Sequence, residues 1–207
     1  MKIYNMPAGA LGTNTYLVID ELSNKGFIVD PGAWNQDMKN RILETGVELE
    51  YIMLTHGHAD HIMGVPGMLK DFPNLKVIAN KEEKDMLADP DFNMSWQFGQ
   101  VTVIEPDILV EDGEKMKVGT LEITFLHTPG HSPGGMCIYV PEWTCCFSGD
   151  TLFQNSIGRT DFPGCSYKKL ADSVHEKLWP MPDNTDIYPG HMGPTYIGWE
   201  KEHNPFV

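Results

Sequence analysis

Residues 55–61 read Thr-His-Gly-His-Ala-Asp-His, so three of the chain's eight histidines stand within one short motif. The apolar residues YIML before it predict a strand that carries the motif to the end of a sheet. His56 and His58 are two positions apart, and an extended backbone points both imidazoles the same way. Asp60 and His61 follow where the chain turns toward the next helix. Imidazole and carboxylate together suit zinc, iron or manganese, so the motif predicts a metal site.

Three further segments repeat one arrangement: an apolar strand, a glycine-containing turn, and then a potential ligand. They place His131 in HTPGHSPGG, Asp150 in FSGDT and His191 in DIYPGH. Because one motif does not complete a metal site, we expect these turns to converge on the first. His127 is a rival ligand four residues before His131, and we predict an outer position for it because the Pro-Gly turn redirects the chain.

The size and charge of the chain restrict its function. It has 207 residues, of which 41% are hydrophobic and 21% charged, as in a soluble globular protein. The formal net charge is −14, and even two divalent ions would leave a surface that repels nucleic acid. No apolar stretch is long enough to span a bilayer, and the N-terminus lacks the pattern of a signal peptide. We therefore expect a cytoplasmic protein with a small-molecule substrate and with neither nucleic acid nor membrane as partner; the sequence does not indicate an oligomeric state.

Strand and helix patterns alternate along the whole chain, with no linker between halves. Apolar spacing predicts helices over residues 35–46, from about 61 to 70, and over 166–179. Residues 90–100 predict an aromatic-rich loop that either covers a cleft or packs onto the core, and core packing is the interpretation we favour. The pattern predicts one α/β domain.

The motifs together resemble the metallo-β-lactamase-fold hydrolases, and within them the glyoxalase II-type hydroxyacylglutathione hydrolases in a short, single-domain form. The resemblance rests on THGHADH, HTPGHSPGG, SGDTLF and YPGH, supported by TNTYLV, FIVDPG, NSIGRTDFPG and IGWEKEHNPF. It implies an αββα sandwich of two packed mixed sheets with helices on the outer faces, as one domain over residues 1–207. It also implies a site along one edge of the sheets. Only 16 residues follow His191, too few for the C-terminal helical region that supplies glutathione-binding surface in two-domain relatives.

The same resemblance implies two divalent metal ions, with zinc expected first and iron or manganese as alternatives. One ion would be held by His56, His58 and His131. The other would be held by Asp60, His61 and His191. Asp150 would bridge the two.

Two bound metals predict hydrolysis without a protein nucleophile. A divalent metal lowers the pKa of bound water from 15.7 to about 7, so a metal-bound hydroxide would be the attacking group. Asp60 would orient that hydroxide in addition to ligating. Because a thiolate leaves readily, and because of the family resemblance, we expect a thioester substrate, S-hydroxyacylglutathione or a related compound. Arg159 either contacts a substrate carboxylate or pairs with Asp161, and the pair is the interpretation we favour.

Other activities of the same superfamily remain open. A persulfide dioxygenase would hold a single iron through His56, His131 and Asp150. A lactonase or other ester hydrolase would use similar attack on an ester-like carbonyl. The chain also departs from the hydrolases at Met192, where relatives continue His191 with glycine; the methionine either narrows the cleft or shifts a turn.

Overall fold

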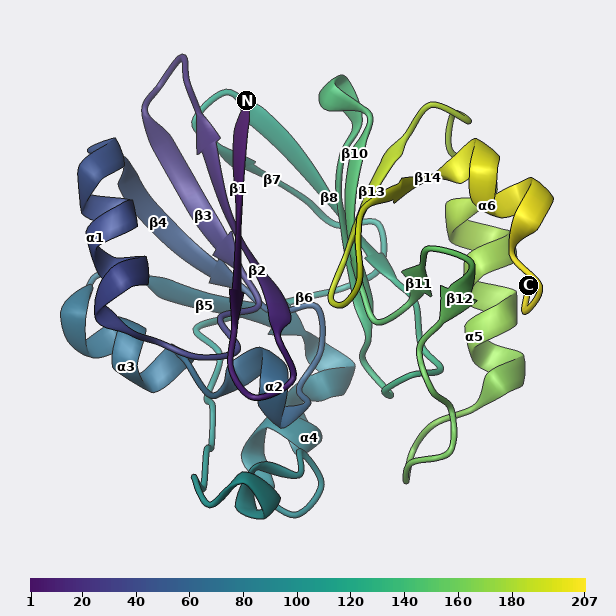
Figure 1. Cartoon of the computed structure of the whole chain (residues 1–207), viewed down its shortest axis with the longest axis horizontal. Helices are drawn as coiled ribbons and strands as arrows, with labels where there is room; N and C mark the ends of the chain where they lie inside the picture. The colour runs from purple at the N-terminus through teal and green to yellow at the C-terminus, as the bar shows by residue number, and fades with distance from the viewer.

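The apolar and β-branched runs of the N-terminal half form a six-stranded sheet in the computed structural model, which describes residues 1–207. Its strands stand in chain order (Figure 1): β1 (Lys2–Ala8), β2 (Thr13–Asp20), β3 (Lys25–Val29), β4 (Glu48–Met53), β5 (Lys76–Asn80) and β6 (Ile108–Val110). β1, β2 and β3 pair antiparallel, whereas β3 to β6 pair parallel. Every residue of β2 is buried, as expected of a strand covered on both faces.

A second six-stranded sheet comes from the C-terminal half, in the order β14-β13-β10-β9-β8-β7. Its strands are β7 (Lys115–Val118), β8 (Leu121–His127), β9 (Met136–Val140), β10 (Cys145–Gly149), β13 (Asp186–Pro189) and β14 (Thr195–Tyr196). β10 and β13 are parallel, and the other pairs are antiparallel. A separate hairpin joins β11 (Leu152–Phe153) to β12 (Ser156–Ile157).

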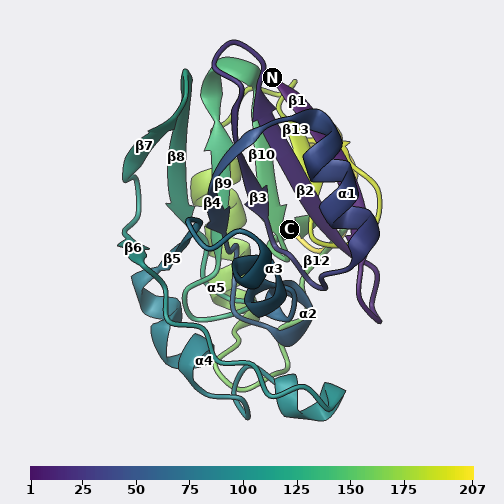
Figure 2. The ribbon, with the colours of Figure 1, turned by 90° about the vertical axis from the view of Figure 1, so that its left-hand side faces the viewer.

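Helices cover the outer faces of both sheets (Figures 1 and 2). The first sheet carries α1 (Gln36–Thr45), α2 (Ala59–Ile62), α3 (Val65–Asp71) and α4 (Lys84–Ala88), and the second carries α5 (Tyr167–Ser173) and α6 (Ile197–His203). Short 3₁₀ turns are η1 (Lys81–Glu83), η2 (Ser95–Phe98) and η3 (Pro141–Trp143), and η4 (Val174–Leu178) is a π-helical continuation of α5. No helix combines the length and the apolar character that a membrane crossing requires.

Three apolar clusters separate the four layers. The central cluster packs Phe27 of the first sheet with Phe125 and Phe147 of the second. A second cluster fills the space between the first sheet and its helices, and a third lies between the second sheet and its helices. The predicted αββα sandwich of two mixed sheets is therefore confirmed.

Two pairs of parallel strands bring distant turns to one edge of the sandwich. β3 ends at Val29, directly before Asp30, and β4 ends at Met53, one residue before the THGHADH motif. β10 and β13 run parallel in the other sheet and lead into Asp150 and His191. Because parallel neighbours end at the same edge, these four turns face one region.

The predicted helix over residues 61–70 is wrong in its extent, since two helices occupy this region. The first, α2, begins at Ala59, and the chain breaks at Gly64 before α3 starts. The N–H of Gly64 donates to the carbonyl oxygen of Pro31 over 2.8 Å and not to a helical partner, which interrupts the helix. A Cβ atom at Gly64 would lie 2.4 Å from this oxygen, so the contact requires glycine. Pro66 is tolerated because it falls in the first turn of α3, where its missing N–H is not needed.

The favoured interpretation of the 90–100 loop is wrong for two of its aromatic residues, Trp96 and Phe98. Trp96 is 54% exposed and Phe98 is 38% exposed, so neither packs into the core. Phe98 instead lines the cavity at the sheet edge, as the alternative interpretation proposed. Local periodicity does not distinguish these outcomes, because both use apolar side chains.

Candidate metal centre

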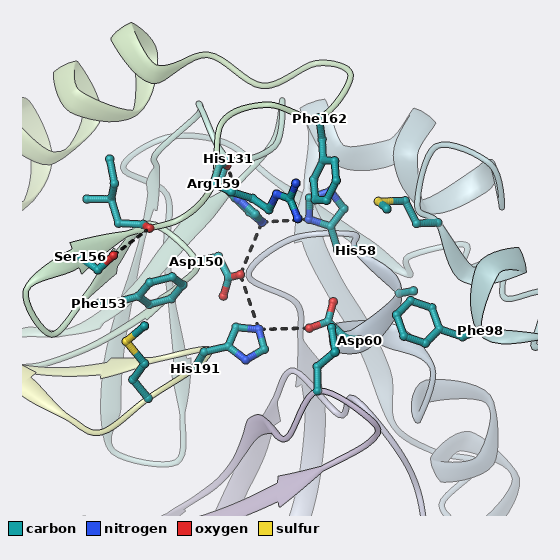
Figure 3. A pocket seen from close by; sticks show the side chains of 15 residues that line it. His58, Asp60, Phe98, His131, Asp150, Phe153, Ser156, Arg159, Phe162 and His191 are labelled. Atoms are coloured by element: carbon teal, nitrogen blue, oxygen red, sulfur yellow. Dashed lines mark hydrogen bonds and ion pairs between the residues drawn. The ribbon is translucent and has the colours of Figure 1, made fainter. Parts of the chain in front are cut away.

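The seven predicted ligand residues come together at the edge of the sandwich, although they come from four separate turns. Figure 3 shows His58, Asp60, His131, Asp150 and His191 directed toward a common centre. His56 and His61 belong to the same motif and are buried, with 2% and 0% of their surface exposed. Glycine permits the close approach: a Cβ atom at Gly190 would lie 2.3 Å from Oδ1 of Asp150.

The first group of possible ligands consists of His56, His58 and His131, and one ligand atom from each lies within 4.8 Å of the others. Nδ1 of His58 is 2.9 Å from Nε2 of His131. The other ring nitrogen of His131, Nδ1, is 2.8 Å from the carbonyl oxygen of Arg159. A proton on Nδ1 that is donated to this carbonyl leaves Nε2 free to ligate.

The second group consists of Asp60, His61 and His191, within the same 4.8 Å limit. Nε2 of His191 is 3.1 Å from Oδ2 of Asp60, and Nε2 of His61 is 3.5 Å from the same oxygen. The hydroxyl of Thr13 also donates to Oδ2 of Asp60, over 2.9 Å. Oδ1 of Asp60 has no hydrogen bond within the protein, which leaves it available to a ligand.

Asp150 lies between the two groups. Its Oδ1 is 3.4 Å from Nε2 of His61, and its Oδ2 is 3.5 Å from Nε2 of His131 and 3.6 Å from Nε2 of His191. Three buried atoms here have no hydrogen-bond partner: Nε2 of His56, Nε2 of His61 and Oδ1 of Asp150. Buried polar atoms without partners are costly unless something else satisfies them. Their convergence fits a site for two metal ions.

Burial keeps two imidazoles of the first ligand group neutral, whereas carboxylate charge surrounds His61 in the second group. Burial and the neighbouring histidines lower the pKa of His56. Burial likewise lowers the pKa of His58, to about 3, so both imidazoles are neutral and can ligate. Burial also opposes a charge on His61, but the carboxylates around it raise its pKa to about 10. Those carboxylates belong to Asp60, Asp150 and Asp30. They attract positive charge to this position, whether a proton or a metal supplies it.

Asp30 orients this second group from behind. Its Oδ1 accepts the N–H of Thr55 over 2.7 Å, and its Oδ2 accepts the hydroxyl of Thr55 over 2.5 Å. Oδ2 also accepts from Nδ1 of His61 over 2.9 Å. Asp30 comes within metal-ligand distance of His56 and His61 as well, but its oxygens are already used by these hydrogen bonds. Its position after a strand and before a Pro-Gly turn was a signal that could have identified it from sequence.

Glu83 joins the two histidine-bearing turns and was not anticipated. Its carboxylate accepts the N–H of Gly57 over 2.7 Å and the N–H of Gly134 over 2.6 Å. The side chain is buried without a cationic partner, and burial raises its pKa to about 7. Gly57 stands between His56 and His58, so the two hydrogen bonds of Glu83 fix the first ligand group. In the sequence, Glu83 reads as an ordinary charged residue of a helix.

A cavity of about 380 Å³ opens above the ligand groups. Apolar side chains dominate its walls (Figure 3), and its lining consists of Leu11, His58, Ala59, Asp60, Met94, Phe98, His131, Asp150, Phe153, Ser156, Ile157, Arg159, Phe162, His191 and Met192. Arg159 lies at the cavity but pairs with Asp161 through two hydrogen bonds of 2.7 and 2.8 Å. Its guanidinium also stacks 3.8 Å from the ring centre of Phe162.

The remaining histidines stay outside the ligand groups. Nε2 of His127 is 3.0 Å from the carbonyl oxygen of Pro133, so His127 occupies an outer position. His175 and His203 are exposed and lie against tryptophan rings.

Comparison with curated proteins finds relatives that are named as hydrolases. It is 36% identical to the probable metallo-hydrolase YqgX of Bacillus subtilis, over 100% of this chain and 98% of that protein. It is 35% identical to the hydroxyacylglutathione hydrolase GloC of Haemophilus influenzae, again over 100% of this chain and 98% of that protein.

Solved structures agree on the fold. The B3 metallo-beta-lactamase BLEG-1 superposes with a TM-score of 0.92 at 35% identity, covering 99% of both chains. TTHA1623, solved in a di-iron-bound form, superposes with a TM-score of 0.87 at 32% identity, covering 99% of this chain and 100% of that one. A family model described as the metallo-beta-lactamase superfamily matches residues 8–191. The chain therefore belongs to the metallo-beta-lactamase superfamily.

Proposed function

We propose that this protein is a metal-dependent hydrolase that cleaves thioesters. The observation that carries the proposal is the position of Asp150 between two ligand groups, with unpartnered buried atoms at the floor of an apolar cavity. The similarity to GloC, which is named a hydroxyacylglutathione hydrolase, supports a thioester as the substrate.

Each predicted ligand is assigned to one of two metal positions by the group in which it lies. One metal ion would be held by His56, His58 and His131, and the second by Asp60, His61 and His191. Asp150 would bridge them. The donor set of imidazole and carboxylate admits zinc, iron and manganese, and the di-iron form of TTHA1623 keeps iron among the candidates. When bound, such ions supply Lewis acidity and make water acidic enough to ionise near neutral pH.

The residues of the chain then position the reactants. Oδ2 of Asp60 accepts from Thr13 and lies on the side of the second ligand group, 3.1 Å from Nε2 of His191, so Oδ1 is the atom that can accept a hydrogen bond from the attacking water. Phe98 and Phe153 lie on opposite sides of the centre (Figure 3) and reduce the access of bulk water to the substrate. In the overall reaction water adds to the carbonyl carbon, the carbon–sulfur bond breaks, and the sulfur leaves as a thiol after taking up a proton.

The lining of the cavity favours a thioester over an amide. An amine leaving group needs a general acid, whereas a thiol with a pKa near 8.5 leaves as thiolate. Apart from the proposed ligands, the lining offers only Ser156 and Arg159 as polar side chains. Neither is a good acid at neutral pH, because arginine holds its proton and serine ionises far above this range.

A second candidate is a persulfide dioxygenase with a single iron. His56, His131 and Asp150 together provide two imidazoles and one carboxylate, the ligand set that non-haem iron oxygenases use. The dioxygenase leaves Asp60, His61 and His191 without a role, so the hydrolase accounts for more of the site.

One purification followed by a substrate panel tests the proposal. The protein is prepared metal-free and reloaded with zinc, manganese or iron, and bound metal is counted by elemental analysis. The panel contains S-lactoylglutathione, simple acyl thioesters, a lactone, a penicillin, and glutathione persulfide with oxygen monitoring. The penicillin is included because BLEG-1 is named a metallo-beta-lactamase.

The outcomes separate the candidates. Two metal equivalents and thioester turnover support the hydrolase. One iron and oxygen consumption with the persulfide would replace it with the dioxygenase, and turnover of the lactone or penicillin alone would reject the thioester. His131→Ala should lose activity and lower the bound metal toward one equivalent, whereas the matched His175→Ala, at an exposed histidine, should retain both equivalents and activity.

A further inference from the structure

Two methionines of the cavity have a backbone conformation that is unusual for their residue type. Six residues other than glycine have positive φ angles: Asn24, Asp30, Met94, Thr144, Asn155 and Met192. Three of the six are Asn or Asp, the types that tolerate this region best. Met94 and Met192, at φ angles of 67° and 68°, have long side chains, and both line the cavity above the candidate metal centre.

The surrounding structure holds both backbones in place. The carbonyl oxygen of Met192 accepts a hydrogen bond from Nδ2 of Asn14 over 2.9 Å. The carbonyl oxygen of Met94 accepts the N–H of Gln97 over 3.1 Å. Both bonds use the main-chain carbonyl oxygen of the methionine, so glycine at either position would make the same turn with less strain. Strained residues cluster at functional sites. The presence of methionine at two positions that suit glycine therefore indicates a function for the side chains.

The two methionines come from different segments of the cavity lining. Met94 directly precedes η2, which carries Phe98, and Met192 directly follows His191. Figure 3 places Phe98 and His191 on opposite sides of the centre. Met192 is 59% exposed and Phe98 is 38% exposed, so apolar surface remains open at the mouth. Methionine is flexible and polarisable and adapts to apolar ligands of different shape.

Apart from the candidate metal centre itself, the walls of the cavity offer no free cation to an anionic substrate group. Arg159 is the only lysine or arginine of the lining, and its guanidinium is engaged by Asp161 and by the ring of Phe162. The formal net charge of the chain is −14. A carboxylate on the substrate would therefore find no free lysine or arginine partner in these walls, whereas an alkyl or aryl group would be buried between them.

We propose that Met94 and Met192 form a two-sided apolar clamp that selects thioesters with an uncharged aliphatic or aromatic acyl group. This inference rests on the proposed thioester hydrolysis and specifies its substrate class. The two methionines determine specificity: they contact the acyl chain and take no part in breaking the carbon–sulfur bond.

A series of thioesters that share one thiol tests the clamp. We compare acetyl, butanoyl, hexanoyl and succinyl thioesters of N-acetylcysteamine, in which succinyl matches butanoyl in chain length but carries a charge. We expect kcat/KM of the wild-type protein to rise from acetyl to hexanoyl and to be lower for succinyl than for butanoyl. The rise should come from KM, because the clamp supplies binding.

Met94→Gly, Met192→Gly and the double variant remove the clamp and relieve the backbone. Because one methylene in an apolar pocket changes discrimination by about 10-fold or more, we expect roughly 10-fold loss of kcat/KM for hexanoyl in each single variant and a larger loss in the double variant. For acetyl the loss should be about twofold at most. Tm should stay the same or rise, since glycine suits a positive φ. A merely structural methionine would instead lower Tm on replacement and affect all acyl groups equally.

The matched control is Thr144→Gly, at φ 43° and outside the cavity. It relieves the backbone in the same way and should leave the acyl preference unchanged. Binding of a non-hydrolysable hexyl thioether, measured by calorimetry, gives a readout that does not depend on turnover, and its affinity should fall in both methionine variants. Hydrolysis without chain-length preference, or with preference for succinyl, would overturn the clamp alone. If no thioester is hydrolysed the proposed function fails, and unchanged thioether binding in the variants would reject the clamp separately.

Discussion

Replacing Asp30 with asparagine should weaken metal binding without breaking the fold. The side chain of Asp30 is buried and accepts from Thr55 and from Nδ1 of His61. A carboxylate can only accept, so a neutral His61, the form that can ligate, must carry its proton on Nδ1. Its Nε2 is then free and faces the candidate centre, where it has no partner within the protein.

Asparagine reverses this arrangement. It tolerates the left-handed backbone of position 30, at φ 49°, so the turn is retained. Its carbonyl oxygen can accept the N–H of Thr55, but its amide group then donates to Nδ1 of His61. The proton of His61 must move to Nε2, the atom that would ligate. Loss of such an orienting partner lowers metal affinity roughly 10- to 100-fold, or about 1.4 to 2.8 kcal/mol.

The assay is a competition between the protein and a chelator of known zinc affinity, run on wild type and Asp30→Asn. Nitrogen NMR of labelled histidine, recorded on the metal-loaded proteins, reports whether Nδ1 of His61 carries the proton. The control is Asp20→Asn, because Asp20 is only 2% exposed and accepts from Leu22, Ser23 and Thr120 away from the centre. The control should lose stability and keep its metal affinity. Wild-type metal affinity in Asp30→Asn, or an unchanged tautomer, would refute the reasoning.

Three further predictions concern the candidate centre. Asp150→Ala should abolish activity and lower metal content at both positions, because it removes the residue that lies between the two groups; turnover like that of wild type would contradict the assignment. Chelation should abolish activity and zinc, manganese or iron should restore it, measured as turnover against metal added; failure with all three metals would count against a metal-dependent reaction. Burial raises the pKa of Glu83 from 4.5 to about 7, so the folded state binds this proton more tightly than the unfolded state. In the metal-free wild type, the free energy of unfolding should therefore fall as the pH rises through that interval. The free energy of unfolding should fall by roughly 3 kcal/mol, at about 1.36 kcal/mol per pH unit. Urea unfolding at pH 5 and pH 8 should show this fall in the wild type and not in Glu83→Gln. If both proteins lose the same stability between the two pH values, the prediction is wrong.

The sequence alone determined the fold class and the residues that could bind metal. Strand patterns alternating with helix patterns predicted an α/β domain, because the periodicity of side chains along an element is a local property. The sandwich arrangement was predicted from the resemblance of the motifs to the metallo-β-lactamase fold. The candidate ligands could be found because each follows an apolar strand and a turn, a pattern visible within a few residues. Where two local patterns gave the same signal, as in the loop around Phe98, the sequence did not distinguish cavity from core.

Only the tertiary structure decided how the site is oriented and what it can accept. Asp30 reaches His61 and Glu83 reaches Gly57 across the fold, and no local pattern records such contacts. The conformations of Met94 and Met192 depend on the turns in which they are held, which a residue name does not specify. The physical reason is that ligand chemistry belongs to single side chains, whereas orientation, burial and cavity shape arise from packing between distant segments.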